Sequence, residues 1–176
     1  MPFSERTREA MNQQLNLEIK AFYAYLAMSD YFDSVSLSGF SQWMFNQSQE
    51  EWTHALKFRA FIQDRGGRVS LRQIPEPTAE FESSLEVFER ALENEEEVSR
   101  SISDIYALAE EEKDFATQAF LNWFVTEQVE EEKTMTDIID WLKRIGDSPQ
   151  GLFMLDEKLA QGGLTGSGVA AEEPPA

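Results

Sequence analysis

Cysteine is absent from this 176-residue chain, and histidine occurs only once, at position 54. Without cysteine, the chain cannot form a disulfide framework, a thiolate zinc site, an iron–sulfur cluster or a cysteine nucleophile. The chain also lacks an N-terminal signal-peptide core and any apolar run of about 18 residues that could span a bilayer. We therefore expect a cytoplasmic protein that does not enter a membrane.

Basic residues are scarce beside acidic ones: 15 lysines and arginines accompany 33 aspartates and glutamates, for a formal net charge of -18. A negative field of this size repels nucleic-acid phosphates and anionic lipid head groups, so neither nucleic acid nor a membrane surface is expected as a partner. Because 41% of the residues are hydrophobic, the chain can still fold around one core. Cations are the partners that this charge favours.

Glycine and proline are too rare to interrupt four long segments, approximately residues 5–33, 37–65, 80–111 and 115–145. Segments of this length are normally helical, and each carries a seam of residues at alternating spacings of four and three. Four such seams predict an all-α protein, a four-helix bundle. A short fifth helix is predicted at residues 148–160, with Ser148 as its N-cap and Pro149 in its first position.

The lengths of the connections predict how the helices are arranged. The first and second helices, and the third and fourth, are joined by only a few residues and should be antiparallel neighbours. The polar segment 66–79 is about 14 residues long and can span a helix of roughly 43 Å, so the second and third helices should be parallel. We expect residues 1–161 to form one domain and residues 162–176 to form a disordered tail.

The middle of every seam is polar, although its ends are apolar. The interrupting residues are Glu18 in the first seam, Glu51 and His54 in the second, Glu95 in the third, and Gln128 and Glu131 in the fourth. Matched helix midpoints would bring all six side chains to one level inside the bundle. Four carboxylates buried there without partners would repel one another or take up protons. Two bound divalent metal ions are the simplest compensation, since they supply four positive charges.

The residue types predict which metals these would be. Glu51 and His54 are three residues apart and therefore share one helix face. A ligand set of mostly oxygen with one imidazole suits iron or manganese better than it suits structural zinc. Carboxylates that bridge two such ions a few ångström apart provide what two-electron chemistry with dioxygen requires.

Four segments resemble, in order, the iron-site motifs of ferritins, especially the non-haem bacterial type. They are LNLEIKAFYAYLAM at residues 15–28, EEWTHALK at 50–57, LENEEEV at 92–98 and WFVTEQVEEEK at 123–133. The resemblance extends from residue 5 to about residue 160. It implies a ferritin-like bundle with ferroxidase activity, Fe(II) and O2 as substrates, and iron storage in a hollow homo-oligomeric shell of 24 subunits. It implies no haem.

The resemblance also implies roles for the residues at the centre of the seams. Glu18, Glu51 and His54 match the ligands of a first iron. Glu51, Glu95 and Glu131 match the ligands of a second iron, and Gln128 matches a residue beside it. These positions are therefore the predicted di-iron centre.

Further roles follow from the same resemblance. Glu50, Glu127, Glu130 and Glu131 match a third iron site of bacterial members, although a solvated helix face is the competing interpretation for the first three. Tyr25 lies where the family has a tyrosine close to the di-iron centre. Its role as an electron donor during oxygen reduction is a hypothesis, and a core tyrosine with a bonded hydroxyl is the alternative.

Other classes of protein remain as alternatives. A rubrerythrin-type di-iron or di-manganese oxidase or peroxidase would normally carry a second Glu-x-x-His, as bacterioferritin does. Here that place reads Gln128 to Glu131, and His54 is the only histidine. A non-enzymatic alternative is an acidic helical scaffold without metal, or a cage that sequesters iron without oxidising it. Particle size and oxygen uptake would separate these possibilities.

Overall fold

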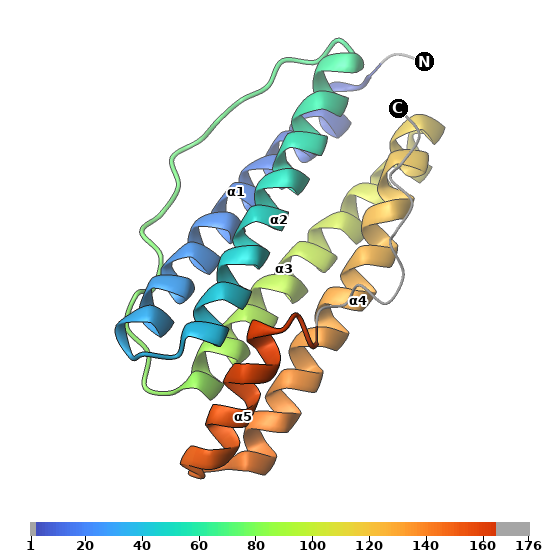
Figure 1. The fold of residues 1–176 in the computed structure, drawn as a ribbon. Coiled ribbons are helices and arrows are strands. Elements are labelled where there is room, and N and C mark those ends of the chain that lie inside the picture. The colour runs from blue at the N-terminus through green and yellow to red at the C-terminus, as the bar shows by residue number, and fades with distance from the viewer. Residues whose placement is uncertain (1–2, 165–176) are drawn as a thin grey trace.

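The structure, a computed structural model, describes residues 3–164. It contains five α-helices in the order α1 (Glu5–Ser34), α2 (Ser38–Asp64), α3 (Ser84–Glu111), α4 (Phe115–Ile145) and α5 (Pro149–Ala160). The first four helices form an elongated bundle, and α5 packs at one end of it (Figure 1). This arrangement confirms the predicted all-α fold. Most of the predicted tail, residues 165–176, lies outside the described residues.

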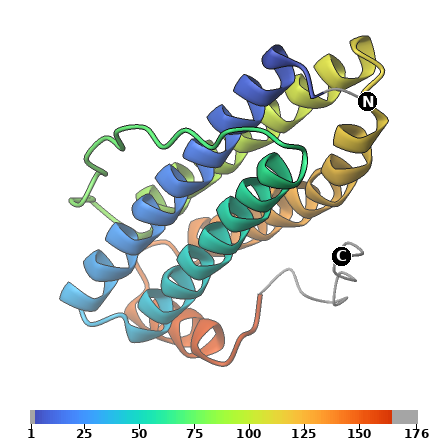
Figure 2. The same ribbon diagram turned by 90° about the horizontal axis from the view of Figure 1, so that it is seen from above.

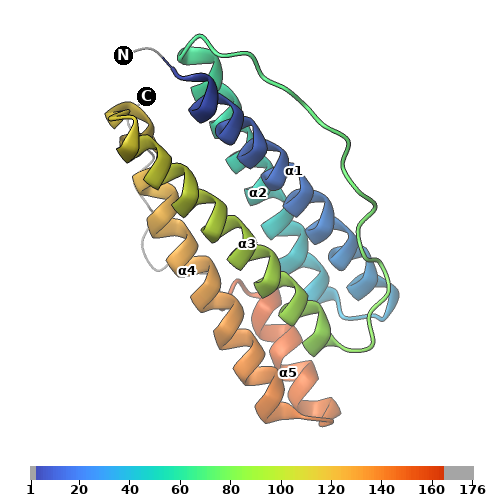
Figure 3. The ribbon, with the colours of Figure 1, turned by 180° about the vertical axis from the view of Figure 1, so that it is seen from behind.

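The connection between α2 and α3 returns along the whole length of the bundle, so these two helices run parallel (Figures 1 and 3). Viewed from above, this crossover passes over α1 (Figure 2). Crossover residues 65–83 link the two helices. The predicted long connection is therefore present, and it allows α3 and α4 to form the second antiparallel pair.

Two asparagines of α1 hold the crossover through its backbone. The side-chain amide nitrogen of Asn12 donates to the backbone carbonyl of Arg68 at 3.1 Å, and the side-chain oxygen of Asn12 accepts from the Ser70 N–H at 2.6 Å. One turn later, Asn16 repeats the pattern with the Ser70 carbonyl at 2.8 Å and the Arg72 N–H at 2.7 Å. These four bonds satisfy backbone N–H and carbonyl groups of the crossover, which is not part of a helix or a sheet.

The start of α3 differs from the prediction, which placed it near residue 80. Ser83 is the N-cap, and its side chain accepts a hydrogen bond from the Glu86 N–H at 3.2 Å, so the helix begins at Ser84. Phe81, which lies within the predicted helical segment 80–111, precedes the helix and packs against Tyr31 with ring centroids 5.1 Å apart. No glycine or proline lies at this boundary. It is determined by capping side chains: Ser83, and Glu86, whose carboxylate accepts from the Glu82 N–H at 2.7 Å.

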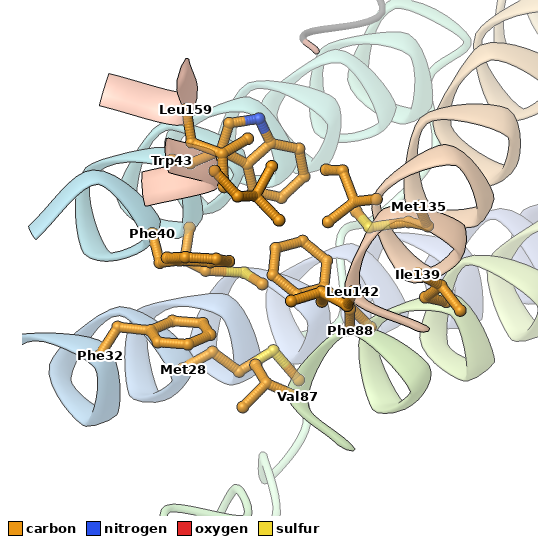
Figure 4. Packing of buried hydrophobic residues seen from close by; sticks show 14 of the residues in the cluster. Met28, Phe32, Phe40, Trp43, Val87, Phe88, Met135, Ile139, Leu142 and Leu159 are labelled. Carbon is orange, nitrogen blue, oxygen red and sulfur yellow. The ribbon is translucent and has the colours of Figure 1, made fainter. Parts of the chain in front are cut away.

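Two apolar clusters fill the bundle on either side of its polar middle. The first, which we call the α5-end core, includes the large aromatic side chains of Phe32, Phe40, Trp43 and Phe88 (Figure 4). The second, which we call the loop-end core, is built around Phe58, Phe124 and aliphatic residues of all four long helices. Apolar packing therefore holds the helices together on both sides of the level at which their seams become polar.

The fifth helix is attached through the start of α2. Leu37, the N-cap residue of α2, supplies no side-chain acceptor, and Asp156 of α5 instead accepts from the Phe40 N–H at 2.9 Å. Gly39 permits this approach, because a Cβ there would lie 1.9 Å from the Asp156 carbonyl oxygen. Leu159 of α5 is buried in the α5-end core (Figure 4). An acidic side chain thus caps the positive end of a neighbouring helix.

Candidate metal centre

The structure brings together the six polar side chains that interrupt the seams. They lie between the two apolar cores, and none is more than 7% exposed: Glu18, Glu51, His54, Glu95, Gln128 and Glu131. Each long helix contributes at least one of them. The level predicted from the helix midpoints is therefore a continuous buried polar layer.

Glu18, Glu51 and His54 form the tightest group in this layer. Each offers one ligand atom, and the three atoms lie within 4.8 Å of one another, close enough to surround a single metal ion. The Nδ1 atom of His54 is 3.5 Å from a carboxylate oxygen of Glu51. The edges of Trp123 and Phe124 flank the imidazole, with ring centroids 5.4 and 5.6 Å away, so the ring is held by packing.

Glu95, on α3, is held by two neutral donors. The Tyr25 hydroxyl donates to one of its oxygens, and the Gln128 amide nitrogen donates to the other at 3.0 Å. The same nitrogen lies 3.4 Å from the Ser99 hydroxyl oxygen, whose hydrogen is donated to Glu132. Because every neighbour of this nitrogen is an acceptor, the amide has one orientation, and its oxygen is turned away from Glu95.

Two further glutamines donate to carboxylates of the layer. The Gln14 amide nitrogen donates to Glu18 at 2.7 Å, and the Gln47 amide nitrogen donates to Glu131 at 3.0 Å. The sequence-based prediction gave neither glutamine a role. A signal was present, however, because Gln14 and Gln47 each stand four residues before a predicted ligand, Glu18 and Glu51, on the same helix face.

Several oxygen atoms of the layer have no hydrogen-bond partner. Both carboxylate oxygens of Glu51, one of Glu18 and the amide oxygen of Gln14 are buried in this way. A buried polar atom without a partner costs about 1–3 kcal/mol, more when it is charged. The donors that do reach the layer are neutral amides and a phenol, so its negative charge is not balanced by them.

The titration behaviour of the layer reflects this imbalance. Burial raises the pKa values of Glu18, Glu51 and Glu131 well above the ordinary glutamate value, and neighbouring carboxylates raise them further. Burial also raises the pKa of Glu95, against the effect of its hydrogen bonds from Tyr25 and Gln128. Without a bound cation, the folded chain thus favours protonated carboxyl groups.

A second group of possible ligands lies next to the first. Glu50, His54 and Glu127 offer ligand atoms within 4.8 Å of one another, and this group is less buried than the first. Burial raises the pKa of Glu127, and the charge of Glu50 adds to the effect. Glu130 is not a member of this group. The predicted third iron site at Glu50, Glu127, Glu130 and Glu131 therefore has two of its residues brought together here with His54, and its assignment stays a prediction.

Comparison with known proteins identifies the family. A family model of the ferritin-like domain matches residues 8–145. The chain belongs to the ferritin family. A bacterial non-heme ferritin of Staphylococcus haemolyticus is 43% identical over 152 residues, which cover 86% of this chain and 92% of that relative. A bacterial non-heme ferritin of Staphylococcus aureus is 40% identical over 89% of this chain and 94% of its own length.

Solved structures agree with this assignment. The open pore ferritin of the archaeon Archaeoglobus fulgidus superimposes with a TM-score of 0.89, at 46% identity, over 91% of this ferritin and 98% of the archaeal chain. A closed form of the Archaeoglobus fulgidus protein, engineered by mutagenesis, gives a TM-score of 0.88 at 47% identity over 90% and 96% of the two chains. The predicted family and its iron-storage function are thereby confirmed.

In the part of this ferritin that the structure describes, no helix is long and apolar enough to cross a membrane. The buried layer is the candidate metal-binding site, because it combines unpartnered oxygen atoms with one imidazole. Such a set matches hard, redox-active divalent cations and leaves open positions around them. The family indicates iron as the cargo, and this ligand set is compatible with it.

Proposed function

We propose that this ferritin binds Fe(II) in pairs at the buried layer, oxidises it with O2 and stores the ferric product inside a shell of identical subunits. The observation that carries this proposal is the set of four buried carboxylates whose donors are all neutral. Two Fe(II) ions would balance their four negative charges. Each Fe(II) ion would supply one electron to O2.

The residues divide between the two ions through Glu51. The first Fe(II) would be bound by Glu18, Glu51 and His54, the group whose ligand atoms already lie within 4.8 Å of one another. Glu51, Glu95 and Glu131 would bind the second Fe(II), with Gln128 beside it. No amide or hydroxyl group donates to either oxygen of Glu51, which supports its assignment as the shared ligand. Carboxylates can hold iron in both oxidation states and still release Fe(III).

A shell of 24 subunits is the assembly we propose. Large apolar side chains on the surface of the single chain support association, because exposed apolar area marks interaction surfaces. Those at least 59% exposed are Leu71, Phe115, Val129, Phe153 and Met154. Gel filtration tests the assembly. A large shell that consumes oxygen and retains far more iron than two ions per chain supports storage, whereas a small oligomer holding only a metal pair would support a rubrerythrin-type oxidase.

Stopped-flow Fe(II) oxidation tests the centre. We expect Glu51→Ala and His54→Ala to slow the rapid phase by about 100-fold or more, since each removes a direct ligand and even supporting residues typically contribute 10- to 100-fold. Glu110→Ala, at an exposed glutamate of α3, serves as the matched control and should react like the wild type. If the rapid phase survived in both ligand variants, the centre would be wrongly placed.

The electron-donor role of Tyr25 requires its own test. Burial raises the pKa of its phenol, so the group stays protonated and donates to Glu95. We expect Tyr25→Phe to slow Fe(II) oxidation several-fold and to remove any tyrosyl radical signal seen by electron paramagnetic resonance during turnover. Unchanged kinetics in this variant would remove the redox role and leave Tyr25 as a core residue that holds Glu95.

A further inference from the structure

We infer that Gln14 and Gln47 are positioning residues of the metal centre: each holds one oxygen of a carboxylate by amide donation and so presents the other oxygen to a metal ion. Gln14 would act on the first ion through Glu18, and Gln47 on the second ion through Glu131. This inference rests on the proposed function, because it concerns the same centre. It assigns a positioning role to two buried residues that are not themselves ligands.

The surroundings of Gln14 show what it does to Glu18. Both side chains are fully buried on α1, one helical turn apart, and the amide nitrogen of Gln14 donates to one Glu18 oxygen at 2.7 Å. The other Glu18 oxygen has no hydrogen-bond partner. The Glu18 carboxylate also belongs to the group of possible ligands with Glu51 and His54. One oxygen is thus occupied by the protein, and its twin is left without a partner.

Gln47 makes the corresponding contact between two helices. It lies on α2, one turn before Glu51, and its amide nitrogen reaches across the bundle to a Glu131 oxygen on α4 at 3.0 Å. Gln47 is 5% exposed, so water does not replace this bond easily. Because the donor and the acceptor are on different helices, the bond also fixes the distance between the ligands that α2 and α4 provide.

The choice of glutamine follows from the charges. A lysine or arginine at either position would neutralise a carboxylate and compete with the metal ion for it. A neutral amide orients the carboxylate and leaves its charge for the ion, as supporting residues of metal sites commonly do. Glu51 has no such donor on either oxygen. This exception fits a ligand that must reach both ions.

Oxygen-free titration of the assembled protein with Co(II) tests the inference without relying on activity. Visible absorption follows the two ions, and the Glu18→Ala and Glu131→Ala variants identify the bands of the first and second ion. We expect Gln14→Met to lower the affinity for the first Co(II) ion about tenfold or more and to leave the affinity for the second unchanged. Gln47→Met should show the reverse pattern.

Matched controls separate positioning from general damage. Gln13 on α1 and Gln42 on α2 are exposed, and Gln13→Met and Gln42→Met should bind Co(II) like the wild type. If either buried substitution impairs assembly, Gln14→Asn or Gln47→Asn keeps the amide but shortens its reach, and the same site-selective loss is expected. Loss of both ions to the same degree in each variant would indicate a merely structural role and overturn the inference.

The outcomes distinguish this inference from the function on which it rests. Two Co(II) ions per chain that are lost in Glu51→Gln, together with wild-type binding by Gln14→Met and Gln47→Met, would overturn the positioning role alone. A wild-type protein whose Co(II) binding does not depend on Glu51 would overturn both. The crossed pattern, in which each glutamine affects one ion only, would support both.

Discussion

Two regions of this ferritin bury carboxylates, and they treat them in opposite ways. At the start of α4, Asp114 is 5% exposed and receives a two-pronged contact from Arg65, with nitrogen–oxygen distances of 3.0 and 3.1 Å. Thr117 donates to the same carboxylate through its hydroxyl at 2.8 Å and through its backbone N–H at 3.2 Å. At the proposed metal centre, three of the four carboxylates receive hydrogen bonds from neutral donors only, and the fourth, Glu51, receives none on either oxygen.

The two regions differ in pKa as well. Burial raises the pKa of Asp114, but the hydrogen bonds from Arg65 and Thr117 outweigh it and leave the pKa below the ordinary value. Burial raises the pKa of Glu51 well above its ordinary value, and Glu95 raises it further. The charge of Asp114 is compensated by the chain itself, whereas at the proposed metal centre a bound cation would supply the compensation. We interpret the incomplete compensation of buried charge as a mark of the proposed functional site.

The largest effect is expected at the completed site. Asp114→Asn keeps the shape and the N-cap acceptor but removes the negative charge that faces Arg65, which leaves a partly buried guanidinium without its ion-pair partner. We expect the free energy of unfolding of the metal-free protein to fall by about 3 kcal/mol. Guanidinium denaturation at fixed chain concentration measures it. Asp104→Asn, at an exposed position of α3, should change it by less than about 0.5 kcal/mol, and equal effects at both positions would contradict the comparison.

A smaller effect of opposite sign is expected at the metal centre. Glu18→Gln removes one uncompensated buried charge and keeps the size of the side chain, so the metal-free protein should become more stable by about 1–2 kcal/mol. The same denaturation experiment reports it. Oxidation of Fe(II) should become slower in this variant, since activity and stability conflict at such sites. A loss of stability comparable to that of Asp114→Asn would show that the centre is already balanced without metal.

The smallest effect is a difference in pH dependence. Between the ordinary glutamate pKa of 4.5 and the raised pKa values of Glu18, Glu51 and Glu131, the folded chain binds more protons than the unfolded chain. Its free energy of unfolding therefore rises as the pH falls through that window. Asp114 acts in the opposite direction: its contribution is present above the ordinary aspartate pKa of 3.8 and is lost as the pH falls through its lowered folded value.

Denaturation of the metal-free protein across this pH range checks both signs. The wild type should be most stable in mildly acidic solution, and the advantage of Glu18→Gln should shrink as the pH approaches 4.5. An advantage that stays constant from neutral pH to 4.5 would mean that Glu18 does not titrate in this window and would weaken the contrast with Asp114.

Much of the fold was predictable because helical seams are local patterns. The positions of Glu18, Glu51, His54, Glu95 and Glu131 within long breaker-free segments were enough to place them at one level of a bundle. The start of α3 was predicted too early, since its boundary depends on the side chain of Ser83, a signal weaker than glycine or proline. Boundaries set by single caps are hard to read from patterns alone.

The details of the site were less predictable. Gln14 and Gln47 could be seen on the polar faces of their helices, but the acceptor of Gln47 lies on α4, far away in the sequence. The salt bridge between Arg65 and Asp114 likewise joins residues 49 positions apart. Long-range partners of this kind depend on the rotation and the spacing of the packed helices, which periodicity does not determine to within a hydrogen-bond length.

The sequence by itself determined the helices, their parallel and antiparallel order and the depth at which carboxylates interrupt the core, because these follow from spacing, breakers and connection length. Only the tertiary structure decided which carboxylate oxygens are held by hydrogen-bond donors and which are left without a partner. That choice depends on distances of about 3 Å between side chains of different helices. It separates Asp114, which the chain neutralises with Arg65, from Glu51, whose two oxygens receive no hydrogen bond and which we propose as a shared metal ligand.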